Sequence, residues 1–274
     1  MRYFKILFDF YLNASVHVAL SVLALTGATQ HLLNITTTID LLAFVFFGTI
    51  VCYNFIKYGV EAKKYLIVSN SYHKYIQIFS FICFGLALYF FFRLESNMWW
   101  AILILGVIST IYAIPLLPSS GNLRSLGGMK IFVVALVWAG ITVVLPVLEV
   151  GIQFNWDIWV MIIQRFLLVL ILILPFEIRD LKWDAKDLRT LPQVLGVART
   201  KQLGIALTIV FMALVFFKDT ISIWQLTGYG LLSITLLLIF ILKKDMGRNY
   251  FASFWVEGIP VLWFGLLLML ERWI

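Results

Sequence analysis

Charged residues are scarce in this chain. Asp, Glu, Lys and Arg make up 13% of its 274 residues, whereas a soluble domain carries about 25%. Apolar residues make up 62%. A chain with so few charges cannot cover a water-facing surface, so the composition excludes a water-soluble domain.

Cysteine is almost absent. The two cysteines, Cys52 and Cys83, both lie in apolar runs, and the chain has no CxxC motif and no Cys/His cluster. The sequence therefore indicates neither a disulfide framework nor a zinc site. A small-residue cleavage pattern is also missing after the first apolar run, so we expect no removable signal peptide.

Long apolar runs are what the sequence has in abundance. A membrane helix needs about 20 mostly apolar residues, and nine runs approach that length. We therefore expect an all-α integral membrane protein with one domain, residues 1–274. The nine predicted spans are 12–33, 40–56, 75–94, 98–117, 130–149, 158–176, 203–217, 222–242 and 254–272.

The placement of the positive charges predicts an orientation. Of the 21 Lys and Arg residues, seventeen fall in the N-terminus or in the loops after the even-numbered spans. Cytoplasmic loops carry the excess of Lys and Arg, so we expect the N-terminus in the cytoplasm and the C-terminus outside. This topology accounts for the net charge of +7. No nucleic-acid recognition motif is present, and we expect no nucleic-acid partner.

Acidic residues concentrate in the loop after the sixth predicted span. Glu177, Asp180, Asp184 and Asp187 fall within eleven residues. On a helix, the first three share a stripe of about 60°. Carboxylates this close are stable mainly when water, Arg or a divalent cation balances them. Interleaved Lys and Arg residues leave a second interpretation open, namely a solvated face of ion pairs.

The end of the second predicted span repeats this spacing. Asn54, Lys57 and Glu61 stand at i, i+3 and i+7, each 123 residues before its acidic counterpart. Four predicted spans separate the two sets, so both lie at cytoplasmic helix ends. We expect the two polar stripes to face each other and to form one site. The spacing match alone does not exclude chance.

These features together resemble the UbiA superfamily of intramembrane prenyltransferases. The second Asp-rich motif of that family has the form D-x-x-x-D, followed by a basic residue and a Thr/Ser-Leu-Pro segment. Asp180, Asp184, Arg189 and residues 190–192 are similar to it. The resemblance covers essentially the whole chain in the number of spans and the position of the loops.

A second segment is similar to the same family. The stretch after the fourth span resembles the family's Tyr-x-x-Pro segment, basic loop and following helix. This resemblance assigns Tyr112, Arg124 and Lys130 to the diphosphate side of a pocket.

The first Asp-rich motif departs from the family pattern N-D-x-x-D-x-x-x-D. Asn54 and Glu61 are present in this segment with Phe55 and Lys57 between them, and no aspartate follows Asn54 there. Lys57 offers a fixed positive charge in place of one metal site. We interpret the chain as a divergent member that uses a single metal ion. The alternative is a weakened or inactive homologue that binds a prenyl lipid or a partner membrane protein.

The resemblance implies prenyl transfer from an isoprenyl diphosphate to an aromatic or lipid acceptor in the bilayer, with Mg²⁺ as cofactor. It implies a multi-pass protein, which we expect in the bacterial cytoplasmic (inner) membrane. By the same resemblance, the catalytic residues are Asp180, Asp184 and Lys57. The metal ligands are Asp180, Asp184, Glu177 and Glu61, and the diphosphate-binding residues are Asn54, Lys57, Tyr112, Arg124, Lys130 and Arg189.

Two other classes of membrane protein fit less well. A transporter is expected to carry polar or broken helices at the middle of the membrane, whereas the acidic residues here gather at one face. A phosphatidyltransferase of the CDP-alcohol type is disfavoured because its D-G-x-x-A-R segment is absent.

Single polar residues also fall inside the predicted spans. Charges in a membrane are costly and mark function by default, but charges near a span end also snorkel to the surface. For Glu257, on the side of the acidic stripe, both readings stay open. We expect Arg165 to pair with Glu149 or Asp157. Asn13 and His17 are expected to form hydrogen bonds between helices.

Overall fold

The computed structural model describes residues 2–59, 71–113, 128–184, 188–243, 245–247 and 249–273. These residues form helices joined by turns, and none of them forms a strand. Eight helical segments among them are long and apolar enough to cross a membrane. The prediction of an all-α membrane protein is thereby confirmed at the level of architecture.

The N-terminal half contains five α-helices and one π-helical turn. The predicted first span, 12–33, is interrupted, because Ser15 adopts a left-handed backbone conformation with a φ of 61° that an α-helix cannot continue through. The candidate span therefore begins only at Val16. The elements are α1 (Arg2–Asn13), α2 (Val16–Leu33), α3 (Ile39–Asn54), η1 (Phe55–Gly59), α4 (Ser71–Phe91) and α5 (Ser96–Ala113).

The fourth predicted span, 98–117, corresponds to α5. Its last residues, 114–117, lie outside the described residues. The apolar stretch of α5 runs over Ser96–Ile111 and is shorter than the eight candidate spans.

The C-terminal half alternates long helices with short irregular turns. Helical structure begins at Leu191 instead of 203, because Gln193 Oε1 accepts a hydrogen bond from the backbone N–H of Thr190 at 3.0 Å and caps the first turn of α9. Gly196, with a φ of 79°, then kinks α9. The elements are α6 (Met129–Ala139), η3 (Gly140–Val144), α7 (Leu145–Val150), α8 (Trp156–Asp180), α9 (Leu191–Ala213), η5 (Leu214–Phe217), α10 (Ile223–Leu242), η6 (Phe251–Val256) and α11 (Ile259–Trp273).

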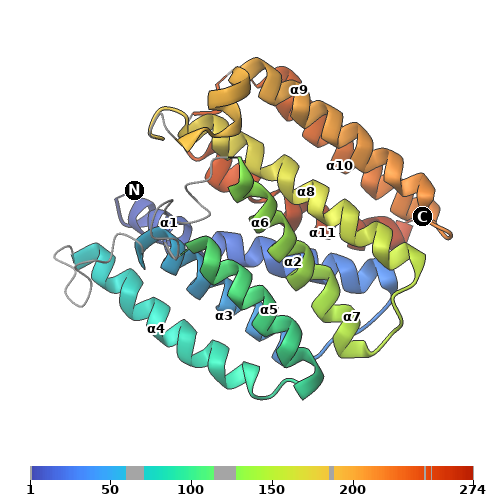
Figure 1. The fold of residues 1–274 in the computed structure, drawn as a ribbon, viewed down its shortest axis with the longest axis horizontal. Helices are drawn as coiled ribbons and strands as arrows, with labels where there is room; N and C mark the ends of the chain where they lie inside the picture. Colours follow the sequence, from blue (N-terminus) through green and yellow to red (C-terminus); the bar gives the residue numbers. More distant parts are fainter. Residues whose placement is uncertain are drawn as a thin grey trace.

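The helices pack side by side in one bundle (Figure 1). α2 packs on α3, α3 on α4, α6 on both α5 and α8, and α8 on α9; α10 then joins α9 to α11, which packs back on α2. Glycines allow two of these close approaches, since a Cβ on Gly204 or Gly228 would come within 2.5 Å of Phe240 or Leu267. Small residues at helix contacts are typical of membrane bundles.

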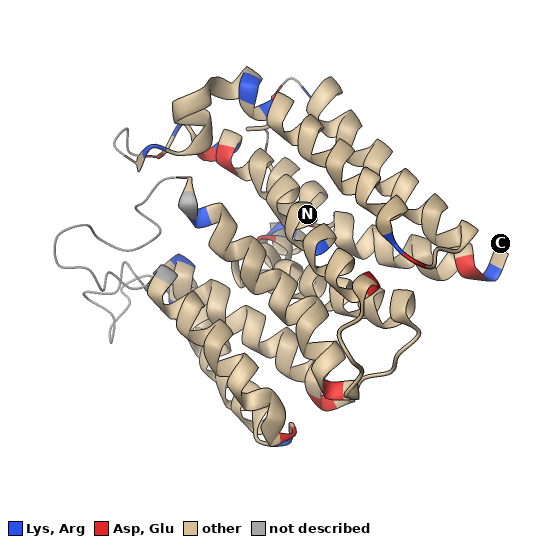
Figure 2. Cartoon of the chain, turned by 45° about the vertical axis from the view of Figure 1, so that its right-hand side comes forward, with Lys and Arg blue, Asp and Glu red and all other residues tan. Residues whose placement is uncertain are grey.

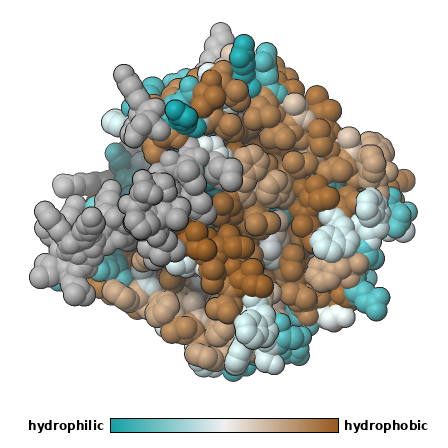
Figure 3. Space-filling model, in the orientation of Figure 1, coloured by the Kyte–Doolittle hydropathy of each residue, from teal (hydrophilic) through white to brown (hydrophobic). Residues whose placement is uncertain are grey.

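The surface of the bundle suits a lipid environment. Charged residues lie mostly near the helix ends (Figure 2), and apolar side chains cover much of the face in Figure 3. Phe81, Ile241 and Leu262 are each more than half exposed. Lipid solvates such side chains, while the helices satisfy their own backbone hydrogen bonds. We call the end of the bundle at which α3 and α8 finish the site end.

Arg165 is buried in the middle of α8, 3% exposed. The predicted pairing with Glu149 or Asp157 is wrong. Its guanidinium donates to the Leu25 carbonyl at 2.7 Å, and to the hydroxyls of Thr142 and Thr29 at 3.0 and 3.1 Å. Glu149 instead accepts hydrogen bonds from Thr38, and Asp157 from Asp219 and Thr220.

Candidate active site

The predicted acidic stripe lies at the C-terminal end of α8. Glu177 is buried on the last turn, and Asp180 is the final residue of the helix. Asp184 follows in a turn, where its backbone N–H donates to the Asp180 carbonyl at 2.9 Å. Only two of the three carboxylates therefore share a helix face, because α8 ends before Asp184. Asp187 lies outside the described residues.

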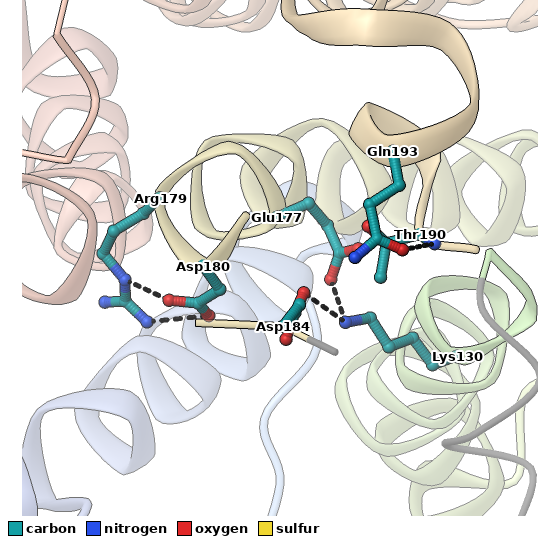
Figure 4. Close-up of polar contacts among 7 residues, drawn as sticks. All are labelled: Lys130, Glu177, Arg179, Asp180, Asp184, Thr190 and Gln193. Carbon is teal, nitrogen blue, oxygen red and sulfur yellow. Dashed lines mark hydrogen bonds and ion pairs between the residues drawn. The ribbon is translucent and has the colours of Figure 1, made fainter. Parts of the chain in front are cut away.

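Lys130 and Arg179 form ion pairs with these carboxylates (Figure 4). Lys130 Nζ lies 2.7 Å from Glu177 Oε1 and 3.9 Å from Asp184 Oδ2. Arg179 donates from Nε and Nη2 to the two oxygens of Asp180, at 2.7 and 3.0 Å. Of the interleaved cations, Arg179 pairs with Asp180, whereas the buried Glu177 pairs with Lys130 from α6, so the interpretation as a solvated face of ion pairs holds only in part.

The ion pairs leave two carboxylate oxygens without a hydrogen bond. Glu177 Oε2 and Asp184 Oδ2 are both buried and accept none among the described residues. Buried carboxylate oxygens are stable only with a donor or a cation beside them. These two oxygens, together with Lys130, therefore form an incompletely satisfied polar centre.

A cavity of about 240 Å³ opens beside this centre. Glu177 and Asp180 line it from α8, Lys130 lines it from α6, and Glu257 lines it from the turn before α11. The end of α3 forms the opposite wall, so the two helix ends with the repeated spacing do meet at one cavity. Tyr53 from α3 and Ile56 from η1 line this wall, whereas Asn54 and Lys57 do not.

A larger apolar cavity of about 480 Å³ adjoins the polar one. Both are lined by Tyr53, Ile56 and Trp138, and Trp138 Nε1 donates a hydrogen bond to the Tyr53 hydroxyl at 2.8 Å. Almost all other residues around the larger cavity are apolar, and they come from α2 to α7. Gly48 and Gly106 widen it because they bring no side chain. The two cavities together have one polar and one apolar part.

The first motif is used partly for packing. Asn54 is buried, and its Nδ2 donates to the Ala14 carbonyl at 3.1 Å and to Ser80 Oγ at 2.8 Å. It thereby ties α3 to the turn after α1 and to α4. Lys57 lies on η1 and donates from Nζ to the Leu12 carbonyl at 3.3 Å.

The structure describes the other predicted site residues only in part. Tyr112 lies on α5, and Arg124 and Glu61 lie outside the described residues. Arg189 has an exposed side chain and a left-handed backbone with a φ of 49°, in the segment between α8 and α9. Among the described residues, no group of three His, Cys, Asp or Glu side chains is arranged to hold a metal ion.

Glu257, which belongs to neither motif, lines the polar cavity from a distant part of the chain. α11, which follows Glu257, packs on α2. On α2, His17 Nε2 lies 2.9 Å from the Phe254 carbonyl, and His17 Nδ1 lies 2.6 Å from the Tyr11 hydroxyl. Since a carbonyl only accepts, Nε2 carries the proton and Nδ1 accepts from Tyr11. Burial, followed by the charge of Glu257, raises the pKa of Tyr11, which lies outside the membrane spans. The expected bonds between helices are confirmed for His17 and for Asn13, which donates to Tyr72.

Comparisons with known proteins identify this architecture. No protein-family model and no curated protein matches the sequence significantly. A UbiA homologue from Archaeoglobus fulgidus, solved with Cd²⁺, superposes with a TM-score of 0.61 at 14% identity, over 95% of this chain and 99% of that chain. The chain has the UbiA fold.

Two further structures support this assignment. The same Archaeoglobus fulgidus homologue bound to GPP and Mg²⁺ has a TM-score of 0.61 at 14% identity, over 96% of this chain and 99% of that one. A digeranylgeranylglyceryl phosphate synthase has a TM-score of 0.57, also at 14% identity, over 97% of both chains. The resemblance noted in the sequence is thus confirmed at the level of the UbiA fold.

Proposed function

We propose that the chain is a divergent UbiA-type prenyltransferase that moves an isoprenyl group from an isoprenyl diphosphate to an aromatic or lipid acceptor. The observation that carries this proposal is the pair of adjoining cavities. One is polar and lies at a helix end, whereas the other is apolar and twice as large. An isoprenyl diphosphate has the same division into a charged head and a long apolar tail.

The diphosphate would lie at the polar centre. Lys130 supplies a positive charge at the cavity wall. Asn54, Lys57, Tyr112, Arg124 and Arg189 are the further candidates for diphosphate binding. Charges fixed in a water-poor site stabilise a leaving group without reorganisation.

A Mg²⁺ ion fits the unsatisfied oxygens of this centre. Glu177 Oε2 and Asp184 Oδ2 are buried without hydrogen bonds, and Mg²⁺ typically takes one or two carboxylates plus phosphate oxygens. Asp180 and Glu61 are the remaining candidate ligands. When bound, the ion supplies positive charge to a departing diphosphate. The UbiA-fold structure solved with GPP and Mg²⁺ supports the choice of metal.

The chain's own residues would orient the substrate and exclude water. The apolar cavity holds the tail, and the Tyr53–Trp138 pair lies at its junction with the polar cavity. Aromatic faces at this junction stabilise a nearby positive charge, which suits an allylic carbon that becomes electron-poor. Asp180, Asp184 and Lys57 are the residues that we propose as catalytic.

The same proposal includes the topology. We place the site end in the cytoplasm, because most of the Lys and Arg residues belong to that side. We further propose that α5 is the ninth span, that the C-terminus lies outside, and that the protein lies in the bacterial cytoplasmic (inner) membrane.

A second candidate function rests on a specific observation. The segment after Asn54 holds Phe55 and Lys57 but none of the aspartates of the usual first motif, and Lys130 and Arg179 already neutralise part of the second. A homologue of this kind would bind a prenyl lipid or a partner membrane protein without turnover.

The decisive experiment uses the purified full chain with geranyl and geranylgeranyl diphosphate. We expect Mg²⁺-dependent release of diphosphate that is lost in the Asp180→Asn/Asp184→Asn double variant. Asp219→Asn, an exposed carboxylate at the opposite end of the bundle, serves as the control. Full activity in the double variant would contradict the site. Tight binding without turnover would support the second function, and the absence of both would contradict both proposals.

A further inference from the structure

Glu257 lies on the polar cavity but outside both Asp-rich motifs. It occupies the turn between η6 and α11, where two helical segments of different pitch meet. The same cavity is lined by Glu177 and Asp180, which approach from α8. A carboxylate in a membrane-spanning segment is costly and marks function by default.

The backbone around Glu257 is fixed on both sides. Its N–H donates to the Ala252 carbonyl at 3.0 Å, and its own carbonyl accepts a hydrogen bond from Ser21 Oγ. A Cβ added to the next residue, Gly258, would come within 2.7 Å of the Phe254 carbonyl. Close packing against α2 therefore fixes the backbone position of Glu257. Its carboxylate is the polar group that this turn contributes to the cavity.

The carboxylate has no close partner in the described part of the chain. No hydrogen bond or ion pair reaches its oxygens there, although Lys57 and Arg179 lie within electrostatic range. The cavity wall around it includes Val169, Leu172 and Pro260. A buried carboxylate requires a hydrogen-bond donor or a cation beside it, and a ligand in the cavity is able to supply the donor.

These surroundings define the ligand that fits. It has an apolar body that matches the wall and a hydroxyl or amine group that donates to the carboxylate. A carboxylate on the ligand is disfavoured next to Glu257, because like charges repel, whereas the diphosphate would lie at Lys130 on the same cavity.

We propose that Glu257 binds the prenyl acceptor, and that it selects neutral hydroxyl-bearing aromatic molecules over their carboxylated analogues. The proposal rests on the proposed function, since it assigns the second substrate of the same cavity. It goes further by giving that substrate a charge and a donor group.

The test uses two matched probes, 1-naphthol and 1-hydroxy-2-naphthoate, which differ by one carboxylate. Binding to the purified full chain is followed by quenching of tryptophan fluorescence, because Trp138 lines the cavity. We expect 1-naphthol to bind at least about tenfold more tightly, because the carboxylate of the other probe is repelled by Glu257 at short range. In Glu257→Gln this preference should disappear, while Glu257→Asp should retain part of it.

A matched control lies on α11, the helix that follows Glu257. Glu271→Gln removes an exposed carboxylate at the far end of α11, which pairs with His31, and should leave both affinities unchanged. Equal affinities for the two probes, a preference that survives in Glu257→Gln, or no binding of either probe would each overturn the proposal.

A further measurement distinguishes failure of the diphosphate site from failure of acceptor binding by Glu257. Binding of the non-hydrolysable geranyl S-thiolodiphosphate with Mg²⁺, measured in the same samples, should be lost in Asp180→Asn and kept in Glu257→Gln. Loss of the naphthol preference alone would leave the diphosphate site standing. Loss of thiolodiphosphate binding alone would leave Glu257 as the binding residue for a neutral aromatic ligand.

Discussion

The ammonium nitrogen of Lys130 lies 2.7 Å from Oε1 of Glu177, which joins α6 to α8 at the wall of the polar cavity. The second oxygen of the same carboxylate accepts no hydrogen bond within the described residues. One side of Glu177 is therefore neutralised by the protein, and the other remains available to a ligand or a metal ion.

Replacing Lys130 by Met is expected to destabilise the bundle. The Glu177 side chain is 5% exposed, so its charge would stay buried without a partner. Removal of one member of a buried ion pair costs about 3–5 kcal/mol, and we expect the lower part of this range because Lys130 keeps some exposure. Thermal unfolding in detergent measures the effect. Lys182→Met, at an exposed position beyond α8, should be nearly neutral, and equal losses in both variants would contradict the argument.

Replacing Gly106 by Leu should shorten the preferred isoprenoid chain. Gly106 lines the apolar cavity, and a Cβ there meets no atom within 4 Å. The added side chain would displace the end of a long tail at a cost of about 0.8 kcal/mol per methylene. We expect geranylgeranyl diphosphate to bind about tenfold more weakly, with a smaller effect on geranyl diphosphate.

The matched control for this variant is Gly230→Leu. Gly230 also has open space around its Cβ position, but it lies on α10 and does not line either cavity. The same loss for both chain lengths in Gly106→Leu, or a similar loss in Gly230→Leu, would show that the cavity does not hold the tail.

Replacing Arg165 by Met should be tolerated better than replacing it by Lys. The hydroxyls of Thr29 and Thr142 keep their bonds to the Leu25 and Trp138 carbonyls without the guanidinium. Met thus leaves no group unsatisfied, whereas Lys keeps a desolvated charge and loses the forked geometry. We expect Arg165→Met within about 1 kcal/mol of the wild type. A melting temperature lower for Met than for Lys would contradict this order.

Replacing Asn54 by Asp tests whether this position is used for packing. Asn54 Nδ2 donates to the Ala14 carbonyl and to Ser80 Oγ. A carboxylate has no donor for the Ala14 carbonyl and would face it with a like partial charge. We expect a loss of about 1–3 kcal/mol, measured by thermal unfolding. Asn54→Asp at wild-type stability would argue against the packing role.

Much of the fold was predictable from the sequence. The long apolar runs predicted helices for all nine segments, because a chain in lipid must satisfy its backbone within each helix. The boundaries were less accurate where local chemistry intervened. Ser15 breaks the first run, and the Thr190–Gln193 cap starts α9 earlier than the apolar run does.

The candidate site was predictable only in part. The spacing of Asn54 and Glu177 placed two helix ends together, but it did not tell which side chains face the cavity. Tyr53 and Ile56 face it, because Asn54 is turned toward Ala14 and Ser80.

The sequence by itself determined the class of protein and the segment that carries the carboxylates of α8, because apolar length and charge spacing are local properties. Only the tertiary structure decided that Lys130 pairs with Glu177, and that Glu257 joins them at the same cavity. The physical reason is that these three residues come from three distant segments, α6, the end of α8 and the turn before α11. Their meeting depends on how the helices pack against one another, which no local pattern records.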